Sequence, residues 1–353
     1  MNNLNIALLE RLCRTPGAPG FEHRVRRAVE EEVAPLVDDT WTDSLGNLIA
    51  LKKGSNNPEG LKVMVAAHLD EIGFIVTHID DDGFVRFHPL GGFDPKTLVA
   101  QRVIIHGKKD LLGVMSSKPI HVMTPEERKT PPQIKDFFID LGMPPEEVRR
   151  VVSVGDAVTR ERELIELGQC VSGKSLDNRV SVFVLIEALR QLERAPYDVY
   201  AVFTVQEEVG LRGVSVATHA IEPDFGIALD TTVAYDLPGA QPQERVTSLG
   251  AGAAVKIMDA SAICDYRMVR FLKQIADQYA LQWQPEVLTA GGTDTAGLQR
   301  QGRRGAIAGA ISIPTRHLHQ VVEMAHKADI DAAIQLLANA LGDIAEYDWE
   351  HSS

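Results

Sequence analysis

The chain has 353 residues, of which 44% are apolar, so it is long enough to bury a large core and to hold two domains. Its net charge of −13 argues against nucleic acid or an anionic membrane as a partner, because both bind cationic surfaces. No apolar run approaches the ~18 residues of a membrane span, and Glu10, Arg11 and Arg14 interrupt the N-terminal stretch where a signal peptide would be apolar, so we expect a cytoplasmic protein.

The first 71 residues read as two amphipathic helices followed by two strands. The apolar spacing predicts helices over 5–14 and 21–37 and strands over 47–52 and 61–67. The second strand runs directly into His68-Leu-Asp70, where a buried strand end is a poor place for unpaired charges.

From residue 72 to 168 the pattern changes to short alternating strands separated by turns. We expect strands at 74–79, 84–89, 102–106 and 112–116. This pattern indicates a small β-barrel inserted into a larger domain, which would then consist of residues 1–71 and 169–353. A loop over 118–132 contains four prolines and could be either mobile or an interface arm.

After Lys174 the chain returns to alternating strands and helices, which indicates an α/β domain. We expect helices at 177–194, 265–279 and 327–347, and strands at 198–205, 225–229 and 305–313. Glu207 and Glu208 follow the first of these strands, Asp230 follows the second, and His317 and His319 follow the third. Polar residues that follow strands gather at one edge of an α/β sheet, and Asp177 would join them from a helix start.

His68 and His319 offer two imidazoles, and five carboxylates come from Asp70, Asp177, Glu207, Glu208 and Asp230. This set fits two divalent cations about 3.5–4 Å apart. If Asp177 bridges the ions, His68 and Asp230 complete one shell, and Glu208 and His319 the other. Three carboxylates facing two dications leave about one positive charge, which a metal-bound hydroxide would neutralise. The site therefore predicts a hydrolase, with Glu207 free to act as general base and Asp70 placed to orient the ring of His68.

Each motif also has an ordinary structural interpretation. The His68-x-Asp70 spacing is common on surfaces, the glutamate pair could be solvated, and Asp230 could cap a helix. The residue types and their spacing do not decide whether His317 or His319 is the ligand. Gly291-Gly-Thr-Asp294 could be a plain turn, although glycines allow the backbone to approach a ligand closely.

The joint pattern resembles the tetrahedral metallo-aminopeptidases of peptidase family M42, which include glutamyl, lysyl and leucyl aminopeptidases and chains labelled endoglucanase. The resemblance extends over nearly the whole chain and is carried by these blocks: His68-Leu-Asp-Glu-Ile-Gly73, Leu90-Gly-Gly-Phe-Asp-Pro95, Val154-Gly-Asp-Ala-Val158, Ser175-Leu-Asp-Asn-Arg179, Gln206-Glu-Glu-Val-Gly210, Gly291-Gly-Thr-Asp294 and Ile313-Pro-Thr-Arg-His-Leu-His319.

The resemblance implies that His68, Asp177, Glu208, Asp230 and His319 hold the metals, with Glu207 as base and Asp70 beside His68. It also implies a role in substrate binding for Gly292, Thr293, Asp294 and His317. The sequence departs from the family pattern at three positions: His317 stands where tyrosine is usual, Gln320 where serine is frequent, and Thr295 where alanine is frequent. These departures concern the substrate pocket rather than the metals.

We therefore expect an aminopeptidase that removes N-terminal residues from short peptides, using two zinc or cobalt ions per subunit, or manganese. The resemblance implies that the inserted domain is PDZ-like, pairs subunits into dimers, and that six dimers close into a hollow dodecamer. The alternatives are a deacylase or carboxypeptidase of the same dinuclear clan, and a non-catalytic metal-binding scaffold. A glycan hydrolase is least expected, because glycosidases use two carboxylates without metal. The preferred N-terminal residue, the native metal and the pathway do not follow from the sequence.

Overall fold

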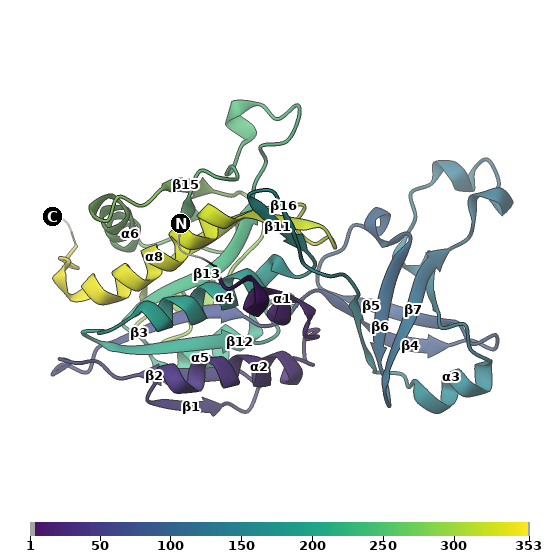
Figure 1. Cartoon of the computed structure of the whole chain (residues 1–353), viewed down its shortest axis with the longest axis horizontal. Helices are drawn as coiled ribbons and strands as arrows, with labels where there is room; N and C mark the ends of the chain where they lie inside the picture. The colour runs from purple at the N-terminus through teal and green to yellow at the C-terminus, as the bar shows by residue number, and fades with distance from the viewer. Residues whose placement is uncertain (1–3, 352–353) are drawn as a thin grey trace.

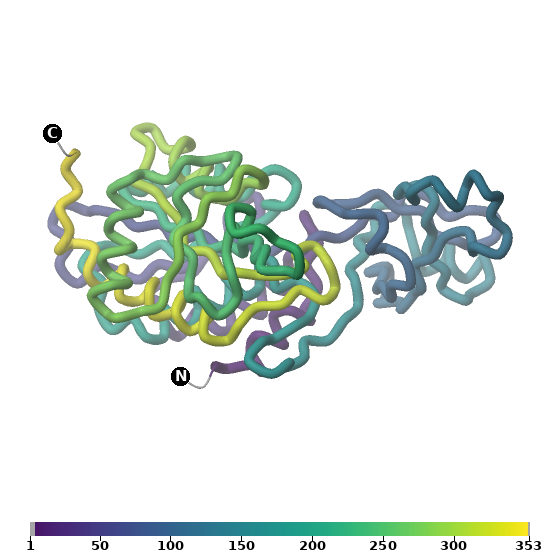
Figure 2. Tube along the Cα trace, turned by 90° about the horizontal axis from the view of Figure 1, so that it is seen from above, coloured from purple at the N-terminus to yellow at the C-terminus, as the bar shows by residue number. Residues whose placement is uncertain are grey.

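The computed structural model describes residues 4–351, which form two lobes (Figures 1 and 2). The larger lobe is an α/β domain and contains both ends of the described chain. The smaller lobe is a closed β-barrel, drawn in blue at the right of Figure 1. The chain leaves the larger lobe after β3 (Lys62–His68) and re-enters its sheet at β10 (Ile165–Leu167), so the barrel is an insertion between two halves of the α/β domain.

Within the described residues, the larger lobe is built on an eleven-stranded mixed sheet. The central strands β12, β3, β13 and β16 are parallel to one another, whereas the flanking strands pair antiparallel. Nine strands lie side by side in this order: β1 (Asp39–Thr42), β2 (Leu48–Lys52), β12 (Asp198–Thr204), β3 (Lys62–His68), β13 (Phe225–Val233), β16 (Ile307–Arg316), β17 (Glu323–His326), β11 (Cys170–Gly173) and β10 (Ile165–Leu167). The last two, β14 (Ala253–Met258) and β15 (Trp283–Val287), branch from β16.

Helices cover both faces of this sheet. One face is covered by α1 (Ile6–Arg14), α2 (His23–Val33), α4 (Leu176–Gln191), α6 (Tyr266–Gln278) and α8 (Lys327–Asp343). The other face is covered by α5 (Arg212–Ile221) and α7 (Thr295–Arg300).

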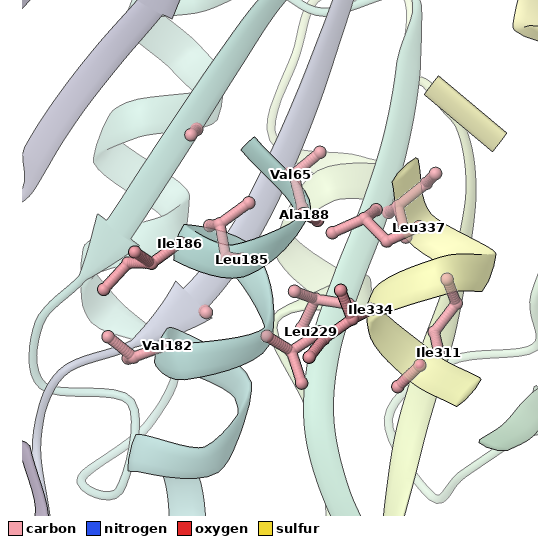
Figure 3. Packing of buried hydrophobic residues seen from close by; sticks show 14 of the residues in the cluster. Val65, Val182, Leu185, Ile186, Ala188, Leu229, Ile311, Ile334 and Leu337 are labelled. Atoms are coloured by element: carbon pink, nitrogen blue, oxygen red, sulfur yellow. The ribbon is translucent and has the colours of Figure 1, made fainter. Parts of the chain in front are cut away.

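The central strands are apolar on both faces because both are covered. In β3, Val63 and Val65 pack into the larger cluster, while Met64 and Ala66 pack into the smaller one on the opposite face. Figure 3 shows side chains of α4 and α8 packed over Val65, Leu229 and Ile311 of the parallel strands. The resulting rigid platform carries the polar residues at its carboxyl edge.

The barrel closes through six strands within the described chain, in the order β4 (Gly73–Ile79), β5 (Val85–Leu90), β8 (Phe137–Asp140), β7 (Asp110–Ser117), β6 (Gln101–His106) and β9 (Ala157–Arg160). It has its own apolar core, and α3 (Pro145–Val151) contributes Val148 to that core. The expected mixed α/β class with a small inserted β-barrel is confirmed. The sequence patterns did not identify β8, β9 and α3, because these elements are short.

None of the described helices is long and apolar enough to cross a lipid bilayer.

Candidate metal centre

The polar residues predicted from the sequence meet at the carboxyl edge of the parallel strands. Asp177 is the second residue of α4, Glu207 and Glu208 lie in the turn between β12 and α5, and His319 follows β16. Two expected positions were wrong in detail. His68 is the last residue of β3, and Asp230 lies inside β13, because that strand stays paired with β16 through Val233.

Two groups of potential metal ligands share Asp177. The first trio comprises His68, Asp177 and Asp230, and the second trio comprises Asp177, Glu208 and His319; in each, the ligand atoms lie within 4.8 Å of one another. The Oδ1 atom of Asp177 lies 3.4 Å from Nε2 of His68, and its Oδ2 atom lies 3.4 Å from Nε2 of His319. The two oxygens of one carboxylate therefore face two different imidazoles.

The chemistry of these groups fits divalent cations. The buried oxygens Oδ1 of Asp177 and Oε1 of Glu208 make no hydrogen bond, which is costly unless a cation lies beside them. Burial and the charge of Asp177 raise the pKa of Glu208 to about 8. Burial alone would lower the pKa of His319, but Asp177 and Glu208 outweigh it and raise that pKa to about 10. Without metal the cluster retains protons, which metal binding would release.

Asp70 and Glu22 hold the turn that carries the two glutamates. The carboxylate of Asp70 accepts the N–H groups of Glu207 and Glu208, both at 3.0 Å. Glu22 accepts the N–H of Gln206, also at 3.0 Å. The ring of His68 contacts the carbonyl oxygen of Asp70 at 3.0 Å, closer than the Asp70 carboxylate at 3.5 Å. The closest partners of the Asp70 carboxylate are therefore the backbone N–H groups of the turn, and the imidazole of His68 is more distant.

Glu323 holds the backbone of two ligands of the second trio, Asp177 and His319, in a similar way. Its carboxylate accepts the N–H of Asp177 at 3.0 Å and that of His319 at 2.9 Å. Sequence reasoning missed Glu22 and Glu323, because both act on backbone atoms rather than through a motif. The one available signal for Glu323 is an acidic residue within the apolar run Val321-Val-Glu-Met-Ala325.

A buried ion pair lies beside Asp177. Lys174 donates to Glu71 at 2.6 Å, and Ser175 donates to the same carboxylate oxygen. Arg179 extends from the first turn of α4 and donates to the carbonyl oxygens of Leu69 and Thr15. These bonds tie the start of α4 to the end of β3 and to the N-terminal helices, and so hold Asp177 opposite His68.

Left-handed backbone conformations are concentrated at the site. Ser175, Gln206, His317 and His319 all have φ between 56° and 62° without being glycine. Such conformations cost of order 1–3 kcal/mol each and persist where surrounding contacts enforce them. His319 is a proposed ligand and the other three each lie two residues before one, so part of the fold's stability is used to orient these side chains.

The ligands open into a cavity of about 560 Å³, which Gly292 and Thr293 also line. Asp294 lies behind the wall, where it accepts a hydrogen bond from Thr204 at 2.6 Å. His317 is half-buried and is not among the described residues that line this cavity. Leu211, Val233 and Leu288 contribute apolar side chains to the lining, and Lys256 and Asp259 contribute charged ones.

Comparison with known proteins identifies the relatives of this chain. The family model described as M42 glutamyl aminopeptidase matches residues 46–336. A putative aminopeptidase of Acetivibrio thermocellus is 38% identical, over 95% of this chain and 97% of its own length.

Solved structures of similar fold support the same family assignment. The aminopeptidase APDkam598 of Desulfurococcus kamchatkensis superposes with a TM-score of 0.91 at 37% identity, covering 96% of this chain and 94% of its own. The TET1 peptidase of Pyrococcus horikoshii, described as assembling into a tetrahedron or a large octahedral shell, gives a TM-score of 0.85 at 30% identity, covering 95% of this chain and 98% of its own. The family match and these similarities run through both lobes, and the chain belongs to the M42 glutamyl aminopeptidase family of peptide-bond hydrolases.

Proposed function

We propose that this protein is a two-metal aminopeptidase that releases N-terminal residues from short peptides. The observation that carries the proposal is the orientation of Asp177, whose two oxygens each lie 3.4 Å from a different imidazole. A carboxylate that bound a single metal ion would need only one imidazole beside it, so this arrangement fits a carboxylate shared by two ions. The first trio would hold one cation and the second trio the other, with Asp177 shared.

Two divalent cations at these positions would polarise the scissile carbonyl and lower the pKa of water. The chain's own contribution is to place the substrate and to move protons. Glu207 lines the cavity but belongs to neither trio, and its Oε2 atom lies 3.7 Å from Nε2 of His68. Burial raises the pKa of Glu207 well above its usual range, which suits a group that must accept and return a proton near neutral pH.

Glu207 would therefore accept the proton of the attacking water and deliver it to the leaving amine. Asp70 supports this role because it holds the backbone N–H of Glu207 and limits where the carboxyl group can reach. Gly292 and Thr293 would contact the substrate, since both line the cavity. For Asp294 and His317 we retain only the expectation from the family resemblance.

The decisive experiment uses metal-stripped protein resupplied with zinc, cobalt or manganese. We expect hydrolysis of aminoacyl anilides to return with close to two metal ions per subunit, with zinc and cobalt the most effective. Cleavage of N-acyl amino acids in place of aminoacyl anilides would favour a deacylase instead. Absence of turnover on any peptide, with metal bound, would favour a scaffold.

We also propose that the protein self-associates through the barrel into a dodecamer built from dimers. Strand β7 supports this because it carries apolar side chains on both faces. Leu111 and Met115 point into the barrel core, whereas Leu112 and Val114 are 59% and 50% exposed. Ile120 and Val122, which follow the strand, are 59% and 62% exposed, so further apolar side chains are exposed just beyond it. A closed assembly would admit short or unfolded peptides and exclude folded proteins. A cytoplasmic location remains our expectation from the sequence.

Light scattering tests the assembly. We expect a mass near twelve times 38.7 kDa, and a smaller species for Leu112→Glu combined with Val114→Glu. The matched control is Val154→Glu, which changes another exposed apolar residue of the barrel. A fully active monomer of the unaltered chain, or efficient trimming of folded substrates, would refute the closed assembly.

A further inference from the structure

The imidazoles of the two trios are held by different lobes. The Nδ1 atom of His68 contacts the carbonyl oxygen of Asp70, two residues further along the same segment. The Nδ1 atom of His319 instead contacts the carbonyl oxygen of Gly92, at 2.9 Å, and Gly92 lies in the barrel loop between β5 and β6. The group that contacts the second ring nitrogen of a ligating histidine sets the tautomer and orientation of the ring, so the barrel contributes to the geometry of the second trio.

Arg160 supplies a second connection from the barrel. It is the last residue of β9, is only 3% exposed, and donates from Nη1 to the carbonyl oxygen of His319 at 2.9 Å. The N–H of His319 is held at the same time by Glu323 of the larger lobe, at 2.9 Å. The backbone of His319 is thus fixed by one contact from each lobe.

The same arginine also orders the loop that contacts the ring. Its guanidinium lies over Phe93, 5.4 Å from the ring centroid, and Phe93 stacks on Phe74 of β4 at 4.4 Å. Phe93 directly follows Gly92. The preceding Gly91 has φ +102°, and a Cβ atom there would approach Ile72 within 2.4 Å, so this turn requires glycine. One buried side chain therefore supports both barrel contacts to His319.

We propose that Arg160 is a positioning residue for the second trio, so that one metal position depends on the barrel and the other does not. The proposal rests on the two-metal site proposed above. It also implies the reverse effect: because coupling between two sites is reciprocal, a cation bound at the second trio stabilises the loop at Gly92.

Calorimetric titration of the metal-stripped full chain with Co²⁺ alone tests this. The unaltered chain should show two binding events, and His319→Ala should identify the event that belongs to the second trio. We expect Arg160→Met to weaken that event by ~10–100-fold, the usual effect of losing a partner of a metal ligand, and to leave the other event unchanged. Arg160→Lys, which keeps the charge and a donor, should retain more affinity than methionine does.

The matched control is Arg150→Met, because Arg150 is an exposed arginine of the same barrel whose side chain is 71% accessible. If Arg160→Met does not fold, Phe93→Leu removes only the ring beneath the guanidinium and should produce a smaller selective loss. Amide hydrogen exchange provides a second measurement, since Co²⁺ should protect residues 91–93 in the unaltered chain and less so in the Arg160 variant.

The outcomes separate the two proposals. A single binding event in the unaltered chain would refute the metal pair itself. Two events that Arg160→Met leaves unchanged, or weakens equally, would refute the positioning role alone.

Discussion

The two trios differ in where their ligands come from, although they share Asp177. In the first, His68 and Asp230 lie on adjacent parallel strands, and the His68 side chain is 2% exposed. In the second, Glu208 and His319 lie on turns at the boundary between the lobes, and the His319 side chain is 38% exposed. Ligands on paired strands are placed by the sheet itself, whereas ligands on turns need contacts from residues far away in the sequence.

The largest effect should come from removing the shared ligand. Asp177→Ala should empty both trios, because each would keep only one carboxylate and one imidazole. We expect activity at background level and no metal in elemental analysis of the purified protein. One full-occupancy metal in this variant would show that Asp177 does not bridge and that the trios are independent.

Glu207 tests whether a residue beside the first trio belongs to it. Glu207→Gln should keep both metals and lower kcat by ~10²–10⁴-fold, the usual contribution of a general base. Glu208→Gln is the matched variant, and it should lose metal from the second trio. If the Glu207 variant loses metal instead, the roles of the two adjacent glutamates are reversed.

Exchanging each imidazole for alanine sharpens the comparison further. His68→Ala and His319→Ala should each retain one metal, but their stability in urea should differ. Removing a fully buried side chain from a strand costs ~1–3 kcal/mol, and we expect less than ~1 kcal/mol at the half-exposed His319. Equal destabilisation would show that the second trio is as firmly supported as the first.

The last effect concerns Glu22, which supports the turn carrying Glu207 and Glu208. Burial, with the charge of Asp70, raises its pKa to about 7, from 4.5. Folding therefore favours the protonated form, so this stabilisation is present below pH 4.5 and is lost as the pH rises through 7. In metal-free protein, Glu22→Gln should remove that loss. The free energy of unfolding of the variant, taken relative to that of the unaltered chain, should therefore be ~1–3 kcal/mol higher at pH 8 than at pH 5.

Urea titrations at the two pH values measure this difference, with Glu193→Gln as the exposed control. Glutamine keeps the acceptor oxygen for the N–H groups of Gly20 and Gln206, so the turn should stay intact. A stability difference between the two chains that does not change with pH would rule out Glu22 as a titrating group.

Much of this molecule follows from local patterns. The alternating strands and helices predicted the α/β lobe, and the short alternating strands between residues 72 and 168 predicted the barrel. The polar residues after apolar strands predicted the cluster, because strand ends of one sheet must lie at a common edge. The positions of individual residues were less predictable. Asp230 lies inside β13 because pairing with β16 continues past it, and pairing is a property of two segments rather than one.

The sequence by itself determined which side chains could bind metal, since only particular residue types at strand ends offer oxygen and nitrogen ligands. The tertiary structure alone decided how those ligands are held. Glu22, Glu323 and Arg160 act on backbone N–H and carbonyl groups of the site. Every residue carries such groups, so no spacing or motif reveals which one a distant side chain will contact. That choice depends on how the helices, the sheet and the barrel pack together in space.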